Sequence, residues 1–278
     1  MNKKVLVLLA ALVILASPIA YADALQDYFD QGLACYKRGD FSQAISLYTK
    51  AIGLESSHPE FYYNRALAFA EQNNYANAIA DYTRAIEMKP NEDSFYLNRG
   101  LVYYSQNDFS RSIADYTTAI GISPNKADLY YNRANSYSRQ SDYARAISDC
   151  DRAIQIKPDY ADAYNTRGFA YYSQKNLSQA MSDYNKAIEI DPNNLRAYAN
   201  RGLVYYDQED YEQAAADQTK AIGIDPNYAY AYSQRSYDYY MLQEYDLAWA
   251  DVRKAQSLGH VMDKSFLDLL KEWSGTEK

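Results

Sequence analysis

The sequence contains very little cysteine and histidine, with 2 of each among 278 residues. Two cysteines cannot form a disulfide framework, and so few Cys and His side chains argue against a dedicated zinc site or a Cys–His nucleophile. Basic residues are also outnumbered, since 28 Lys and Arg stand against 36 Asp and Glu and leave a net charge of −8. A chain of this charge offers no basic face for phosphates, which argues against a nucleic-acid partner.

The sequence also lacks a phosphate-binding loop, a metal-ligand helix and a nucleophile elbow. We therefore expect no enzyme activity, no cofactor, no metal and no small-molecule substrate. Tyrosine is abundant, with 32 residues, and 48% of the chain is hydrophobic, which is enough to bury a substantial core.

An apolar run from Val5 to Ala16 follows two lysines near the N-terminus. Further on, Ala20-Tyr21-Ala22 has the small-x-small pattern that signal peptidases cut. These features predict a secretory signal peptide over residues 1–22, cleaved after Ala22. An uncleaved membrane anchor is the alternative, although the run is shorter than the roughly 20 apolar residues that span a bilayer. We expect an exported protein, periplasmic or secreted, in a bacterial envelope, with membrane contact only if the signal peptide is retained.

The rest of the sequence repeats itself with a period of 34 residues. Three residue types mark the period: a tyrosine early in each unit, an alanine late in it, and a proline that closes the five middle units. These residues are Tyr28, Tyr62, Tyr96, Tyr130, Tyr164, Tyr198 and Tyr232; Ala51, Ala85, Ala119, Ala153, Ala187, Ala221 and Ala255; and Pro90, Pro124, Pro158, Pro192 and Pro226. The period predicts seven repeats, over residues 25–58, 59–92, 93–126, 127–160, 161–194, 195–228 and 229–262.

Each repeat has the pattern of two amphipathic helices. In repeat 161–194, Tyr164 and Gly168 lie on one helical stripe, and Tyr184 and Ala187 lie on another. Polar residues 174–176 between the stripes predict a turn. Two short helices cannot bury both stripes between them, so each repeat must stack on its neighbours.

The unit resembles the tetratricopeptide repeat, a 34-residue helix–turn–helix motif. In repeat 93–126 the residues that fit its pattern are Tyr96, Gly100, Tyr103, Tyr116, Ala119 and Pro124. The resemblance implies an all-α solenoid, a right-handed superhelix of seven helix–turn–helix units within residues 23–262, that binds another protein.

Residues 263–278 are expected to form a C-terminal capping helix and a short tail. Phe266, Leu269, Leu270 and Trp273 are spaced as one stripe of an amphipathic helix. Such a stripe would cover the exposed face of the last repeat, as a solenoid requires at its ends.

Arginine and aspartate occur together, 16 residues apart, in every repeat but the first. The pairs are Arg65 and Asp81, Arg99 and Asp115, Arg133 and Asp149, Arg167 and Asp183, Arg201 and Asp217, and Arg235 and Asp251. The first repeat has Gln31 and Leu47 at these places. The joint pattern predicts a structural ladder of Arg–Asp pairs between packed helices, because the planar guanidinium suits a carboxylate. An anion-binding stripe of arginines is the alternative.

By the same resemblance, several first-helix positions line a concave groove that would hold the partner. The candidate groove residues are Tyr63, Asn64, Leu97, Asn98, Tyr104, Tyr131, Asn132, Asn135, Phe169, Tyr172, Asn200, Tyr206, Tyr237 and Tyr240. Tyrosine provides contact area at little conformational cost, and asparagine amides can bind a peptide backbone. Packing between helices and hydrogen bonding between repeats are the alternatives for these side chains.

The sequence as a whole predicts an exported scaffold or adaptor that holds a partner peptide or helix in an aromatic groove. The alternative is a holdase-type periplasmic chaperone or an assembly factor for envelope proteins.

Overall fold

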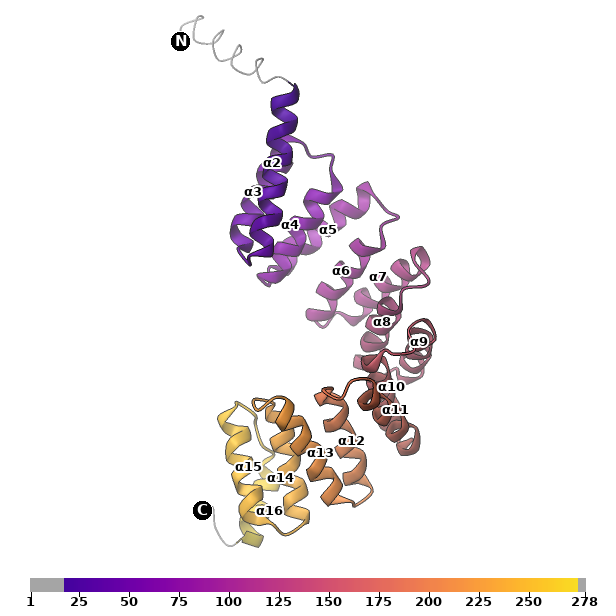
Figure 1. The fold of residues 1–278 in the computed structure, drawn as a ribbon, viewed down its shortest axis with the longest axis vertical. Helices are drawn as coiled ribbons and strands as arrows, with labels where there is room; N and C mark the ends of the chain where they lie inside the picture. The colour runs from indigo at the N-terminus through magenta and orange to yellow at the C-terminus, as the bar shows by residue number, and fades with distance from the viewer. Residues whose placement is uncertain (1–17, 275–278) are drawn as a thin grey trace, which may run out of the picture. The chain divides into compact units, whose positions relative to one another are not determined.

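The computed structural model describes residues 18–274, and these residues form helices with no strand among them (Figure 1). The described chain divides between Asn125 and Lys126 into two compact units, here unit 1 and unit 2. Unit 1 contains α2 (Pro18–Lys37), α3 (Phe41–Leu54), α4 (Pro59–Glu71), α5 (Tyr75–Met88), α6 (Asp93–Ser105) and α7 (Phe109–Ile122). Unit 2 contains α8 (Ala127–Arg139), α9 (Tyr143–Ile156), α10 (Ala161–Ser173), α11 (Leu177–Ile190), α12 (Leu195–Asp207), α13 (Tyr211–Ile224), α14 (Ala229–Met241), α15 (Tyr245–Ser257) and α16 (Lys264–Ser274).

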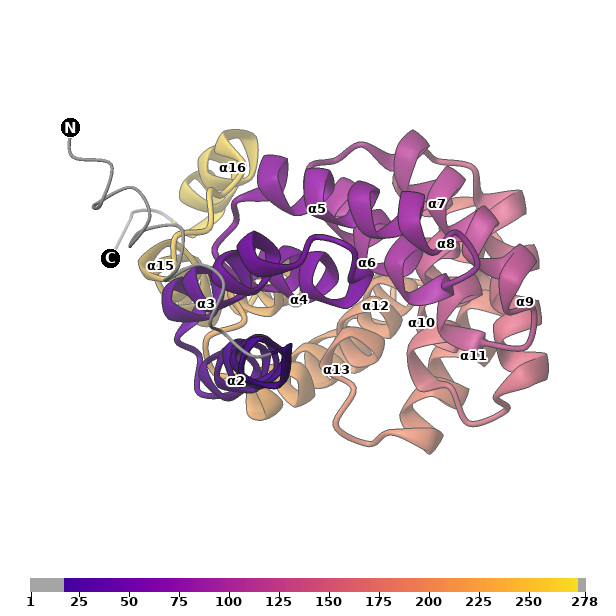
Figure 2. The ribbon, with the colours of Figure 1, turned by 90° about the horizontal axis from the view of Figure 1, so that it is seen from above.

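Helices α2 to α15 pack as consecutive pairs, each made of an even-numbered first helix and an odd-numbered second helix (Figures 1 and 2). Within each unit the second helix of one pair packs against the first helix of the next. The first helices of successive pairs also contact each other, as α2, α4 and α6 do in unit 1 and α8, α10, α12 and α14 do in unit 2. We call the side of each unit formed by these first helices its first-helix face.

The turn inside each pair has the same backbone conformation in every repeat. One residue there adopts a positive φ, between 57° and 64° at Asn73, Asn107, Ser141, Lys175, Glu209 and Gln243 and 82° at Gly39. In five of the seven pairs the second helix then begins behind a capping side chain, as where Asp108 accepts from the Arg111 backbone N–H at 3.0 Å. The predicted turn at residues 174–176 therefore ends α10 and starts α11.

Small residues let the two helices of a pair approach closely. The late alanine of every repeat, from Ala51 to Ala255, is fully buried. A Cβ atom added to Gly100 would lie 2.7 Å from Cε1 of Tyr116, a ring with no exposed surface. A methyl group at this crossing would therefore force the buried ring to shift.

The all-α repeat fold predicted from the sequence is confirmed, and the prediction for the C-terminal helix is partly wrong. Phe266 and Leu270 of α16 are buried against the last pair, as predicted. Leu269 and Trp273 are 45% and 62% exposed. The helix is rotated so that Leu267 packs against the core in their place, because the shape of the last pair selects which stripe is buried.

The predicted signal peptide lies mostly outside the described residues. Its proposed cleavage sequence, residues 20–22, falls within α2. Within residues 18–274, no helix combines the length and the apolar character that crossing a membrane requires. The predicted bounds of the repeats and of the signal peptide stay predictions.

Candidate protein-binding face

The arginines and aspartates that recur 16 residues apart meet as pairs in both units. In unit 1, Arg65 and Arg99 each donate through Nε and Nη2 to both carboxylate oxygens of their aspartates, at 2.7–2.8 Å. In unit 2 the same two bonds, at 2.7–2.9 Å, join Arg133 to Asp149, Arg167 to Asp183, Arg201 to Asp217 and Arg235 to Asp251. All six aspartates are buried. The guanidinium groups are therefore occupied and do not form a free anion-binding stripe.

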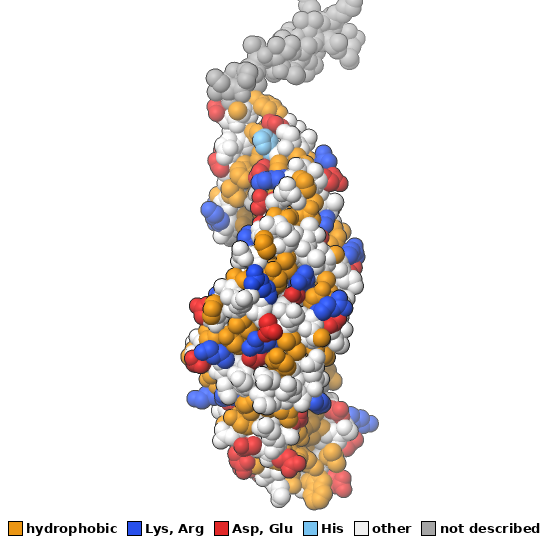
Figure 3. Space-filling model, turned by 90° about the vertical axis from the view of Figure 1, so that its right-hand side faces the viewer, with side chains coloured by type: hydrophobic (Ala, Val, Ile, Leu, Met, Phe, Trp, Pro, Cys, Tyr) orange, Lys and Arg blue, Asp and Glu red, His pale blue; other side chains and the backbone are white. Residues whose placement is uncertain are grey.

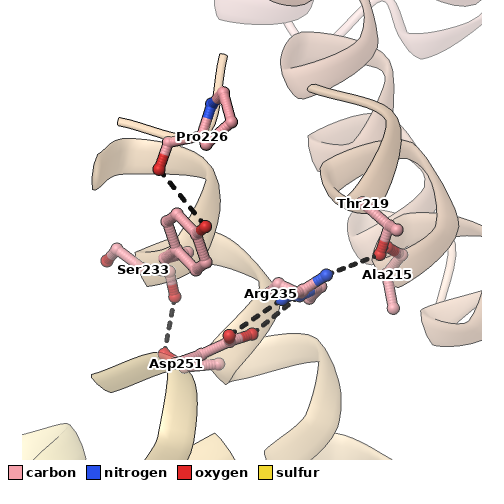
Figure 4. Close-up of polar contacts among 8 residues, drawn as sticks. Ala215, Thr219, Pro226, Ser233, Arg235 and Asp251 are labelled. Atoms are coloured by element: carbon pink, nitrogen blue, oxygen red, sulfur yellow. Dashed lines mark hydrogen bonds and ion pairs between the residues drawn. The ribbon is translucent and has the colours of Figure 1, made fainter. Parts of the chain in front are cut away.

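Five of the six arginines follow another repeat of the same unit. Each of these five also donates a hydrogen bond to a side chain of that preceding repeat. Figure 4 shows Arg235 of α14 between Asp251 of α15 and Thr219 of α13, to which Nη1 donates at 2.8 Å. The corresponding Nη1 bonds run from Arg65 to Thr49, Arg99 to Thr83, Arg167 to Asp151 and Arg201 to Asn185, at 2.5–3.0 Å. These arginines thus tie one repeat to the next, which the 16-residue spacing alone does not reveal.

Tyrosines enclose the guanidinium groups. The Arg99 guanidinium lies 5.9 Å from the ring centroids of both Tyr96 and Tyr103, and Arg235 lies 5.7 Å from Tyr232 and 5.4 Å from Tyr239. Rings three residues before and four residues after the arginine therefore provide cation–π contacts on one helix. The hydrogen bonds to Asp115 raise the pKa of Arg99. Part of the tyrosine richness is explained by this enclosure and not by partner binding.

The predicted groove residues of unit 1 lie half-buried on its first-helix face. The ring of Tyr63 packs 4.9 Å from that of Phe95, and Tyr104 packs 5.4 Å from Phe109. Burial raises the pKa of Tyr63, so its hydroxyl stays protonated. A small cavity of about 210 Å³ lies on this face, lined among others by Leu67, Glu71, Asn98 and Leu101.

In unit 2 the predicted aromatic residues follow one another along α8, α10, α12 and α14. Phe169 is 39% exposed, and the others are half-buried. Their ring contacts join Tyr131 to Tyr160, Phe169 to Tyr143, Tyr206 to Tyr211, and both Tyr237 and Tyr240 to Phe266, while Lys175 lies over Tyr172. Tyr237 and Tyr240 therefore contribute to seating α16 as well as to the face.

The asparagines on this face are partly used inside the protein. The Nδ2 atoms of Asn64, Asn98 and Asn132 each donate to the carbonyl oxygen four residues earlier, at 2.7–2.8 Å. Asn98 also bonds Tyr63 of the preceding repeat, and Asn200 bonds Asn165 in the same way. Asn135 accepts a bond from Thr166 of the following repeat. Hydrogen bonding within and between repeats, one of the alternatives raised by the sequence, is thus observed.

Two adjoining cavities open at the C-terminal end of the first-helix face of unit 2. The first, cavity A, has about 450 Å³ and is lined by Tyr206, Ser233, Gln234, Tyr237, His260, Val261 and Asp263. The second, cavity B, has about 330 Å³ and is lined by Tyr206, Tyr237, Tyr240, Met241, Asp263, Ser265, Phe266 and Leu269. Volumes of this size suit side chains of a ligand. Sequence reasoning named three tyrosines here but missed the other residues, because the docked α16 segment creates the cavities.

A buried polar pair in unit 2 breaks the repeat pattern. Asp238 is 2% exposed, and its Oδ2 has no hydrogen-bond partner; Oε1 of the buried Gln218 likewise has none. The equivalent residues Tyr184 and Val204, one repeat earlier, pack together in one cluster. Asp238 of α14 and Gln218 of α13 occupy the places that Val204 and Tyr184 hold one repeat earlier. Burial raises the pKa of Asp238 to about 8, although the positive charge of Arg235 acts to lower that pKa.

Residues 18–274 contain no group of three or more His, Cys, Asp or Glu side chains able to hold a metal ion. On the face drawn in Figure 3, acidic and basic side chains are interspersed with apolar ones.

Family models match three stretches of the sequence, residues 29–93, 100–160 and 168–228, the last two through overlapping matches. Models described as tetratricopeptide repeat match residues 29–93, 127–160 and 195–228, and one described as TPR repeat matches residues 100–141 and 168–208. Together they match 187 of 278 residues. Comparison with curated protein sequences gives no match.

Solved structures share the fold. A tetratricopeptide repeat protein from Parabacteroides merdae ATCC 43184 aligns at a TM-score of 0.74 and 19% identity, over 91% of this chain and 100% of its own. YrrB, described as a TPR protein with an unusual peptide-binding site, aligns at 0.53 and 24%, over 66% of this chain and 95% of its own. PilF of Pseudomonas aeruginosa aligns at 0.64 and 16%, over 76% and 96%. At these identities the similarity establishes the fold alone.

Proposed function

Because the chain belongs to the tetratricopeptide-repeat family, whose fold serves protein–protein interaction, we propose that it is an exported scaffold that holds a partner peptide or helix on its first-helix face. The observation that carries the proposal is the row of half-buried aromatic side chains on α10, α12 and α14, which ends at cavities A and B. Amphipathic tyrosines give contact area without requiring complete desolvation of the hydroxyl. YrrB, with its peptide-binding site, provides a precedent on the same fold.

Export is the second part of the proposal. It is supported by the apolar run at Val5–Ala16 and the Ala20-Tyr21-Ala22 sequence that follows. Mass spectrometry of the N-terminal peptide, purified from the native cells, should find Asp23 as the first residue. An intact N-terminus at Met1 in the soluble fraction would contradict export by this route, whereas an intact N-terminus in the membrane fraction would indicate a retained anchor.

Crosslinking in the native cells, followed by pull-down of the tagged protein and mass spectrometry, tests the binding function. A partner recovered in stoichiometric amount should bind less tightly to the double variant Tyr172→Ala, Tyr206→Ala, by about tenfold or more, because aromatic side chains on exposed faces dominate such contacts. Leu247→Ala is the matched control, since Leu247 is an exposed apolar residue on the second helix α15.

Equal affinity of wild type and the double variant, both folded by circular dichroism, would contradict the first-helix face as the binding site. A broad spread of clients in place of one stoichiometric partner would favour the holdase chaperone.

A further inference from the structure

Cavities A and B are two compartments of one recess. They share Tyr206 of α12, Tyr237 of α14 and Asp263, the residue before α16. All three elements belong to unit 2, and the recess lies at the end of the aromatic row on the first-helix face. A ligand in either compartment would therefore contact the same two tyrosine side chains and the same carboxylate.

The compartments differ in polarity. Cavity B is walled by Tyr240, Met241, Phe266 and Leu269, and two of these apolar side chains, Met241 and Leu269, are 40% and 45% exposed. Cavity A is lined by the polar side chains of Ser233, Gln234 and His260. Cavity B therefore suits an aliphatic or aromatic side chain, and cavity A suits a polar one.

The charge of the recess is negative. Asp263 is the one Asp or Glu in its lining, and no lysine or arginine lines either cavity. Oδ1 of Asp263 accepts bonds from the Ser265 backbone N–H and hydroxyl and from the Phe266 N–H, at 2.5–3.4 Å. These bonds lower the pKa of Asp263 and keep it ionised. They occupy one carboxylate oxygen, and Oδ2 remains for a ligand.

We infer that this recess binds a segment of a partner protein in which an arginine or lysine stands beside an apolar residue. The apolar side chain enters cavity B, and the cationic group reaches Asp263 in cavity A. The rings of Tyr206 and Tyr237 provide faces over which the cation lies, as other tyrosines do for the arginines of the ladder. This inference rests on the proposed function, since it specifies the partner's chemistry for the same face.

The test uses three libraries of fluorescent octapeptides with Arg-Leu, Ala-Leu or Glu-Leu fixed at the centre and the other positions random. Their binding to the full mature chain is measured by anisotropy at low and moderate salt. The Arg-Leu library should bind about tenfold more tightly than the Ala-Leu library, the size expected of a hydrogen bond to a charged group, and the Glu-Leu library should bind least. The preference should fall as salt increases.

The variant Asp263→Asn removes the charge but keeps an oxygen that can cap α16. It should lose most of the preference for the Arg-Leu library over the Ala-Leu library, because only the tyrosine rings then remain to bind the cation. The matched control is Asp210→Asn, which changes a residue with the same capping role at α13, outside both cavities. Leu269→Ser should weaken binding of all three libraries while the preference for arginine persists.

Equal binding of the three libraries by wild type, or an unchanged preference in Asp263→Asn, would overturn the inference. A native partner that depends on Tyr172 and Tyr206 but not on Asp263 would refute the inference and leave the proposed function standing. Absence of both peptide binding and a native partner would refute the proposed function itself.

Discussion

Replacing Arg99 by glutamine is expected to lower the free energy of unfolding by about 3 kcal/mol, because it leaves the buried carboxylate of Asp115 without its partner. The same change removes the bond from Nη1 to Thr83 that joins α6 to α5 of the preceding repeat. Urea denaturation followed by circular dichroism measures the loss.

The first repeat supplies the compensating variant, because Gln31 and a buried Leu47 stand there in place of the arginine and the aspartate. The double variant Arg99→Gln, Asp115→Leu should recover most of the lost stability, since an apolar side chain replaces a buried ion pair well. Arg84→Ala, which removes one member of an exposed pair with Glu87, should leave the denaturation midpoint nearly unchanged. An Arg99→Gln midpoint as close to wild type as that of Arg84→Ala would show that the ladder does not stabilise the fold.

The variant Asp238→Asn should make the protein more stable than wild type, by a margin that grows with pH. Below about pH 4 the carboxyl is protonated in both the folded and the unfolded chain, so its ionisation contributes nothing. Between about pH 4 and pH 8 the unfolded chain releases this proton while the folded chain retains it. Wild-type stability therefore falls as pH rises, by up to about 1.4 kcal/mol per pH unit, and levels off above pH 8. Asparagine has no proton to lose.

Comparing the two proteins at each pH isolates Asp238 from the other carboxylates. Arg235 of α14 favours its ionised form and Asp251 of α15 opposes it, while Tyr206 of α12 also lies within its electrostatic reach. Asp238→Val, which copies Val204 of the preceding repeat, should show the same pH profile as Asp238→Asn. A difference between wild type and Asp238→Asn that stays constant from pH 4 to pH 8 would contradict a retained proton.

The repeat fold could be predicted from the sequence because its determinants are local and recur. An alanine that returns every 34 residues meets the same neighbours each time, and all seven are buried as the period requires. The Arg–Asp pairs could be predicted for a similar reason. The arginine and the aspartate are both present in six repeats and both absent from the first. Their separation of 16 positions places them on the two adjacent helices of one hairpin, where their side chains meet.

The surface chemistry could be predicted only in part. The pattern placed Tyr63, Tyr172 and Tyr206 on the first helices, but their degree of burial depends on which rings the neighbouring repeats supply. The asparagines were candidates for binding a peptide backbone, and the fold directs one amide donor of Asn64, Asn98 and Asn132 to their own helices. A side chain's free hydrogen-bonding groups follow from its three-dimensional neighbours, which a linear pattern does not specify.

The sequence by itself determined the period, the helical pairs, the alanine core and the partners within each Arg–Asp pair, because each depends on spacing along one hairpin. Tertiary structure alone decided the third bond of the arginines, which crosses from one repeat to the next, and the burial of Asp238 with one carboxylate oxygen unpaired. It also decided which stripe of α16 is buried, and with it the recess formed by Tyr206, Tyr237 and Asp263. These features arise where a helix meets a surface that does not belong to its own repeat, and the fit of the two surfaces selects the rotation and the contacts.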